Sequence, residues 1–172
     1  ATDPRPKEEP VADLSTDTRT LKAGSVFVPL VGESFDGHDY AQKAVELGSI
    51  AIVWGRPEIP QELRDSGISI FPVKDTTEAY QRLGLTHRKA CGARCIGITG
   101  SVGKTTTKEF LGHLLEGQFK VHKSSKNYNN DIGVPLTLLG LEPDHDLVIV
   151  EMGMRGPRQI ARLVRAAEPE VG

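Results

Sequence analysis

The sequence predicts an α/β protein with mostly parallel sheets, built from two modules over residues 1–90 and 91–172. Short apolar segments of strand length alternate with segments in which apolar residues recur at helical spacing. The 172 residues include 18 glycines and 11 prolines, a content typical of frequent turns between strands and helices. A glycine-rich segment, residues 97–106, joins a strand pattern directly to a helix pattern. Together these features indicate strands covered by connecting helices.

In the first module, apolar runs predict the strands, and residues that start or stop helices predict the helices. Residues 25–30 predict a strand, and Pro29 places it near a sheet edge or a strand end because proline lacks an N–H. Asp39 is a suitable N-cap for a helix that Gly48 ends. Further strands are expected at 50–54 and 68–73, and a helix from Asp75 or Thr76 to about Ala90.

The second module repeats the alternation. Residues 94–99 predict a strand that runs into the glycine-rich loop, and residues 105–116 predict the helix that follows. The other expected elements are strands at 119–122 and 147–150, a short helix opened by Pro135 and a last helix opened by Pro157.

Composition excludes several classes of protein. Twenty-one Lys and Arg against 23 Asp and Glu leave a net charge of −2, which argues against a nucleic-acid binder driven by bulk charge. No apolar run approaches the ~20 residues of a membrane span. Two cysteines, Cys91 and Cys95, cannot make a disulfide framework or a four-ligand zinc site. With no recognisable signal peptide, these features lead us to expect a soluble cytoplasmic protein, and we expect it to be a monomer.

The strongest chemical signal is the glycine-rich loop. Gly100 and Gly103 allow a tight turn whose N–H groups face an anion, and the following helix adds its positive end. Lys104 would neutralise phosphate oxygens, and the Thr105 hydroxyl would bind Mg²⁺. The loop is a shorter form of the usual motif, since Ile98 stands where the first glycine is expected. The alternative is a turn with a surface lysine. The predicted ATP-binding residues are Gly100, Ser101, Val102, Gly103, Lys104, Thr105 and Thr106.

Two further segments offer partners for this loop. Glu151 follows the predicted strand at 147–150, where a second metal ligand is expected, although a solvated residue at a strand end is the alternative. The segment Lys126 to Pro135 contains three asparagines within four residues, whose carboxamides can hold phosphate oxygens without adding charge. Asparagine-rich loops are more often simple turns.

These motifs together resemble the Mur ligases of peptidoglycan synthesis. The matching segments are Thr-Gly-x-x-Gly-Lys-Thr, Asn-x-Asn-Asn-x-Ile-Gly-Val-Pro and Glu-Met-Gly, and the stretches Thr16 to Arg19, Gly32-Glu33 and Asp36 to Asp39 agree with the family's N-terminal domain. The resemblance implies a UDP-sugar-peptide-binding domain over residues 1–90 and the first part of an ATPase domain over residues 91–172. The segments Asn129 to Gly133 and Glu151-Met152-Gly153 are most similar to the branch that joins D-Ala-D-Ala to UDP-MurNAc-tripeptide.

The resemblance also implies roles for individual residues. Lys104, Asn129 and Asn130 would be catalytic residues beside the γ-phosphate, and Thr105 and Glu151 would hold Mg²⁺. The UDP moiety would lie near Thr16, Asp17, Thr18, Arg19 and His38. ATP would phosphorylate the substrate carboxylate, and the amine of D-Ala-D-Ala would then attack the acyl phosphate. Positioning and neutralising charge would be the main tasks of such a site.

Other readings remain open at this point. One is the ligase branch that adds the third residue of the peptide, although that branch would be expected to show a Thr-Thr-Pro-type segment. Another is a non-ligase phosphate-loop protein such as a kinase, a GTPase or a nucleotide-binding module. No Asn-Lys-x-Asp segment supports a GTPase. Family members continue beyond Gly172, so we expect an N-terminal fragment that does not catalyse ligation alone.

Overall fold

The structure is a computed structural model, and it describes residues 11–32, 34–125, 128–154 and 156–172. Glu33, Lys126 and Asn127, which belong to motifs named above, lie outside the described residues. The chain divides into two compact units, Ala1–Thr76 and Thr77–Gly172. Helix α3 (Thr76–Cys91) begins where this division falls, and the boundary expected at residue 90 stays a prediction.

Unit 1 contains a four-stranded parallel sheet in the order β1-β2-β3-β4. Its strands are β1 (Leu14–Ser15), β2 (Val26–Phe27), β3 (Ala51–Trp54) and β4 (Ser69–Pro72). Its helices are the 3-10 helix η1 (Gly37–Tyr40), α1 (Ala41–Glu46) and α2 (Gln61–Asp65). The core joins Phe27, Ile52 and Trp54 of the sheet to Ala44 of α1 and Leu63 of α2. Its strands are short, and each pairs in parallel with its neighbour in the sheet, as expected.

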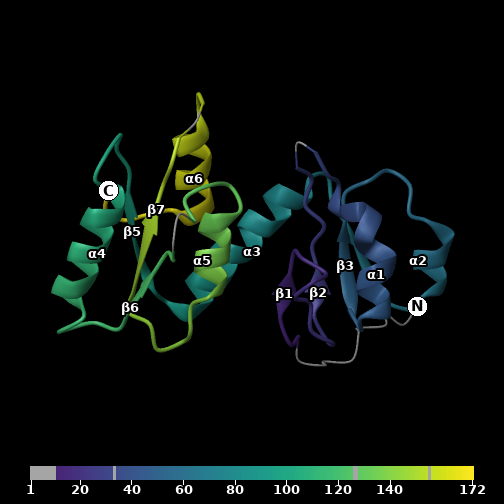
Figure 1. The fold of residues 1–172 in the computed structure, drawn as a ribbon. Coiled ribbons are helices and arrows are strands. Elements are labelled where there is room, and N and C mark those ends of the chain that lie inside the picture. Colours follow the sequence, from purple (N-terminus) through teal and green to yellow (C-terminus); the bar gives the residue numbers. More distant parts are fainter. Residues whose placement is uncertain (1–10, 33, 126–127, 155) are drawn as a thin grey trace, which may run out of the picture. The chain divides into compact units, whose positions relative to one another are not determined.

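Unit 2 contains a three-stranded parallel sheet in the order β5-β7-β6. The strands are β5 (Arg94–Ile98), β6 (Val121–Lys123) and β7 (Leu147–Glu151), and the helices after α3 are α4 (Lys104–Leu115), α5 (Gly133–Leu139) and α6 (Gln159–Ala167). Figure 1 shows α4 on one side of this sheet and α5 and α6 on the other. A core on the α5–α6 side includes Val148 and Val150 of β7, Leu138 of α5 and Leu163 of α6.

The fold class predicted from the sequence is confirmed, whereas several boundaries are wrong. Asp39 does not cap α1: its N-cap is Tyr40, and the Asp36 side chain instead accepts from the His38 N–H at the start of η1. Proline does not open the last two helices, because α5 begins two residues before Pro135 and α6 begins at Gln159 after a left-handed Arg158. Residues 61–65 form a helix, and residues 14–15 form a strand, that the pattern did not predict.

Two further findings concern the helices and the cysteines of the described residues. None of their helices has both the length and the apolar character needed to cross a membrane. Cys91 and Cys95 are free thiols, and burial raises the pKa of Cys95 to about 12.

Candidate nucleotide-binding site

The loop from β5 to α4 has the backbone of an anion-binding turn. Gly100 has φ +145° and Gly103 has φ +80°, both in the region that residues with side chains rarely adopt. Gly103 is the N-cap of α4, so the positive end of a helix of 12 residues points at this loop. The Lys104 ammonium donates to the Gly100 carbonyl over 2.7 Å. Ser101, Val102 and Thr106 are exposed around the turn.

Glu151 is the point where three segments meet. It is the last residue of β7, pairs in register with Ile98 at the end of β5, and is only 3% exposed. One carboxylate oxygen, Oε2, accepts a hydrogen bond from Thr105 Oγ1 over 2.8 Å, and Oε1 accepts one from Asn129 Nδ2 over 3.0 Å. The structure therefore brings together three residues predicted from separate motifs.

The charge of Glu151 is not balanced by a cation of the described residues. Its two side-chain partners are a hydroxyl and a carboxamide, and no Lys or Arg in the described ranges forms an ion pair with it. Burying a carboxylate without a cation is costly. The arrangement therefore favours a positive ligand at this edge of the sheet.

The two asparagines predicted as catalytic have different surroundings. The backbone carbonyl of Asn129 accepts from the Gly153 N–H over 2.7 Å, and a Cβ on Gly153 would lie 2.9 Å from the Asn129 carboxamide carbon. Gly153 thus permits the close approach of Asn129 to Glu151. The Asn130 Oδ1 instead accepts from the N–H groups of Ile132 and Gly133 at the start of α5.

Two buried residues beside Glu151 were not predicted from the sequence. Lys108 is 1% exposed and donates to the backbone carbonyl of Ser124 over 2.7 Å. Ser124 is 2% exposed, and its hydroxyl accepts from the Glu151 N–H over 3.3 Å. One signal was present, because Lys108 lies four residues after Lys104 and therefore on the same face of α4.

In unit 1, Thr16, Asp17, Thr18 and Arg19 form a turn after β1. The Arg19 guanidinium donates to both carboxylate oxygens of Asp17, with a shortest distance of 2.6 Å. Side-chain and backbone hydrogen bonds from Arg19 hold the pKa of Asp17 below its ordinary value. Arg19 is exposed, while Thr16 and Thr18 are half-buried. Their contact with the UDP moiety stays a prediction.

His38 already has partners on both ring nitrogens. Nδ1 lies 2.6 Å from Asp36 Oδ1, and Nε2 accepts from the Gly55 N–H over 3.0 Å. The ring is buried edge-on against Trp54. Partial burial acts to raise the pKa of Asp36, but hydrogen bonds from His38 and Arg56 outweigh it and lower the pKa to about 2. Direct binding of UDP by His38 stays a prediction, and its present contacts connect Asp36, before η1, to Gly55, which follows β3.

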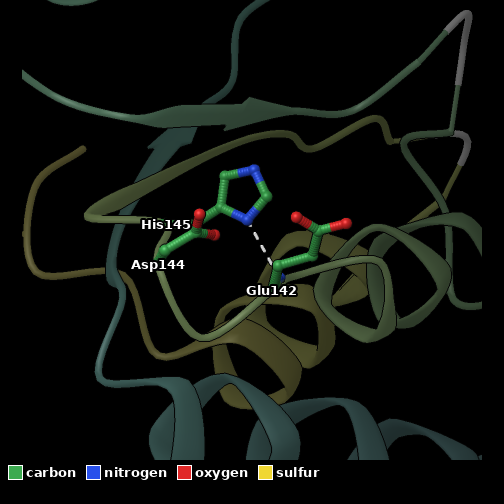
Figure 2. A group of neighbouring side chains, drawn as sticks. All are labelled: Glu142, Asp144 and His145. Atoms are coloured by element: carbon green, nitrogen blue, oxygen red, sulfur yellow. Dashed lines mark hydrogen bonds between the residues drawn. The ribbon is translucent and has the colours of Figure 1, made fainter.

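The opposite, amino end of the unit 2 sheet carries another polar group. Glu142, Asp144 and His145 lie in the segment before β7, and Figure 2 shows their side chains close together. His145 Nδ1 accepts from the Glu142 backbone N–H over 2.9 Å. The Lys120 ammonium forms ion pairs with Asp144 and Glu142. A cavity of about 360 Å³ opens at this same end, lined by residues that include Cys91, Arg94, Phe119 and His145, and so lies away from the phosphate loop.

Unit 2 has the features of a phosphate-loop nucleotide-binding module. Its sheet is parallel, a glycine-rich loop joins a strand to a helix, and an acidic residue ends the neighbouring strand. Comparison with known proteins narrows this class. The Mur ligase middle domain matches residues 98–172, and the catalytic domain of the Mur ligase family matches residues 10–88. The chain belongs to the Mur ligase family.

Named relatives agree with this assignment. The UDP-N-acetylmuramoyl-tripeptide–D-alanyl-D-alanine ligase of Synechocystis sp. is 48% identical over 162 residues, which are 94% of this chain and 35% of that protein. The Bacillus subtilis ligase of the same name is 38% identical over 97% of this chain and 36% of its own length. This chain therefore spans about a third of the length of these relatives.

Solved structures give the same fold. A crystal structure of MurF from Acinetobacter baumannii matches with a TM-score of 0.84 at 33% identity, over 97% of this chain and 35% of that one. MurF from Thermotoga maritima in complex with ADP matches with a TM-score of 0.80 at 31% identity, over 92% of this chain and 36% of that one.

Proposed function

We propose that this chain supplies the substrate-binding and ATP-binding modules of a ligase that joins D-Ala-D-Ala to UDP-MurNAc-tripeptide. The observation that carries the proposal is the meeting of Thr105, Glu151 and Asn129 beside the phosphate loop. The names of the relatives supply the substrates, since those relatives are tripeptide–D-alanyl-D-alanine ligases.

The donor atoms at this edge fit Mg²⁺. Thr105 Oγ1 and Glu151 Oε2 are 2.8 Å apart, and neighbouring ligands of an octahedral ion with bonds of about 2.1 Å lie roughly 3.0 Å apart. The ion would replace the hydrogen bond between them with little movement, and it would supply a positive charge that none of the described residues gives to Glu151. Its chemistry there would be neutralisation of the phosphate oxygens.

The residues of the chain would divide the work as follows. The loop from Gly100 to Thr106 would wrap the phosphates of ATP, and Lys104 would turn from the Gly100 carbonyl to the γ-phosphate. Asn129 would hold Glu151 in place, and Asn130 would lie beside the transferred phosphoryl group. In unit 1, Thr16, Asp17, Thr18, Arg19 and His38 would form or support the UDP site.

The reaction needs little covalent chemistry from the protein. The terminal carboxylate of the tripeptide attacks the γ-phosphorus of ATP, giving an acyl phosphate and ADP. The free amine of D-Ala-D-Ala then attacks the acyl carbon, loses a proton and expels inorganic phosphate as the amide forms. A carboxylate oxygen is a poor leaving group until it is phosphorylated, so positioning and charge neutralisation carry the rate.

Phosphate release by the protein at its full natural length tests this proposal. Release should require both UDP-MurNAc-tripeptide and D-Ala-D-Ala. Turnover with UDP-MurNAc-dipeptide and a diamino acid instead would assign the chain to the branch that adds the third residue. ATP hydrolysis that ignores every amine acceptor would indicate a nucleotide-binding protein of another kind. We also place the reaction in the cytoplasm, where ATP and nucleotide-linked precursors are dissolved, and expect a monomer in sedimentation experiments.

A further inference from the structure

Lys108 is a charged side chain that the proposed reaction does not use. It lies in α4, one helical turn beyond Lys104, and is 1% exposed. Lysine is seldom fully buried unless its ammonium is paired, because removal of the charge from water is costly. Here the ammonium donates to the Ser124 carbonyl over 2.7 Å and lies 3.2 Å from Glu109 Oε1.

The Ser124 end of this contact leads directly to the site. Ser124 follows the last residue of β6 and opens the segment that contains Asn129. Its N–H donates to the Ile149 carbonyl over 3.0 Å, and its hydroxyl accepts from the Glu151 N–H over 3.3 Å. A single residue therefore fastens the start of the asparagine segment to β7 at the level of Glu151.

We propose that Lys108 is a positioning residue of the phosphate site: through Ser124 it sets where Glu151 and Asn129 stand relative to Thr105. The inference rests on the proposed function, since it takes this edge of the sheet as the site of magnesium and nucleotide. Thr105 and Lys108 project from the same stretch of α4, three residues apart. The helix thus contacts Glu151 twice, directly through the Thr105 hydroxyl and indirectly through Lys108 and Ser124.

Lys108→Met separates positioning from simple packing. Methionine keeps an apolar stem of similar length and removes the ammonium, so the buried Ser124 carbonyl loses its donor and the melting temperature should fall. The Mg²⁺ concentration that gives half-maximal ADP binding to the folded protein should also rise about tenfold, as for removal of residues that orient metal ligands. A purely structural lysine would lower the melting temperature in the same way but leave the Mg²⁺ requirement of the folded fraction unchanged.

The matched control is Lys89→Met. Lys89 lies on α3, is exposed and pairs with Glu168 over 2.7 Å. The substitution therefore removes a lysine of the same unit without touching the site. Its ADP binding should match that of the unsubstituted protein. Equal Mg²⁺ requirements in Lys108→Met and Lys89→Met would overturn the inference.

Ser124→Ala provides a second, independent arm. It removes the hydroxyl that accepts from Glu151 and leaves Lys108 in place, so it should raise the Mg²⁺ requirement in the same direction by a smaller factor. If both residues act in one path, the double variant should be no worse than Lys108→Met. Additive losses would overturn the inference. Should Lys108→Met fail to fold, Ser124→Ala decides alone, and unchanged binding in that variant counts against the proposal.

The protein at its full natural length serves for all arms, with ADP and Mg²⁺ as the probes in calorimetric titration. If the unsubstituted protein binds no ADP with Mg²⁺, the proposed function fails and the inference fails with it. If it binds and Lys108→Met binds equally well, only the inference fails. Binding of ADP without ligation activity would count against the proposed function alone.

Discussion

At the carboxyl end of the unit 2 sheet a carboxylate is buried, whereas at the amino end of the same sheet carboxylates are exposed. Glu151 is 3% exposed, and its side-chain partners are the neutral groups of Thr105 and Asn129. Glu142 and Asp144 lie in solvent and share the ammonium of Lys120. The first arrangement leaves a negative charge without an ion pair among the described residues, while in the second both carboxylates pair with the same lysine.

This difference is the one expected between a cation-binding site and a polar surface. A buried carboxylate with only neutral donors gains much from an added cation, because the surroundings are poor in water. Exposed carboxylates beside a lysine gain little, since water and salt already screen them. The three close side chains at the amino end therefore do not by themselves indicate a metal site.

Glu151→Gln should have the largest effect. The amide keeps the shape and one acceptor oxygen but removes the charge that would hold Mg²⁺. Because loss of residues that only orient metal ligands costs 10–100-fold, loss of the ligand itself should reduce Mg²⁺-dependent phosphate release by about 100-fold or more. The melting temperature should not fall, since the substitution removes a buried charge that has no ion pair among the described residues. Steady-state phosphate release and calorimetry measure the two quantities.

The matched control for that substitution is Glu142→Gln at the amino end. It removes a charge from the same sheet, and phosphate release should change less than twofold because Glu142 is exposed and already screened. Equal losses in the two variants would remove the distinction between the two ends.

Asn130 gives an intermediate effect and tests a finer difference within the carboxyl end. Its side chain accepts from the N–H groups of Ile132 and Gly133, so Asn130→Ala should lower the free energy of unfolding by about 1 kcal/mol in urea denaturation. Asn130→Ser keeps an acceptor oxygen and should recover most of that stability. If Asn130 also contacts the γ-phosphate, phosphate release should still fall in Asn130→Ser. Full activity in that variant would restrict the role of Asn130 to the start of α5.

Strong local patterns made much of the fold predictable. The apolar run of β7 and the glycine-rich loop before α4 leave few alternatives, and both lie where expected. The ends of α1, α5 and α6 were predicted less well. Capping depends on which acceptor reaches a free N–H: Asp36 rather than Asp39 faces the backbone of η1, and α6 follows a left-handed Arg158 that no motif indicates.

The site was predictable only as far as motifs extend. Thr105, Asn129 and Glu151 each belong to a recognisable segment, and the parallel pairing of both β5 and β6 with β7 brings them together. Lys108 and Ser124 belong to no motif, and their importance depends on a contact between a helix and the end of a strand 16 residues away. The twin asparagines look equivalent in sequence, but the start of α5 uses the side chain of one of them.

Lys120→Met should have the smallest effect, and it tests the amino end directly. The side-chain hydrogen bond from Lys120 holds the pKa of Asp144 below its ordinary value of 3.8. Because the pKa is lower in the folded chain, the pair stabilises the fold above about pH 4, and this contribution is lost as the pH falls further. In Lys120→Met the pKa of Asp144 should rise towards 3.8 in a carboxyl ¹³C titration, while the melting temperature at pH 7 barely changes because both side chains are exposed. ADP binding should be unchanged. A loss of Mg²⁺-dependent ADP binding in this variant would mean that the two ends of the sheet are coupled, and the charge balance at one end would then be part of the site at the other.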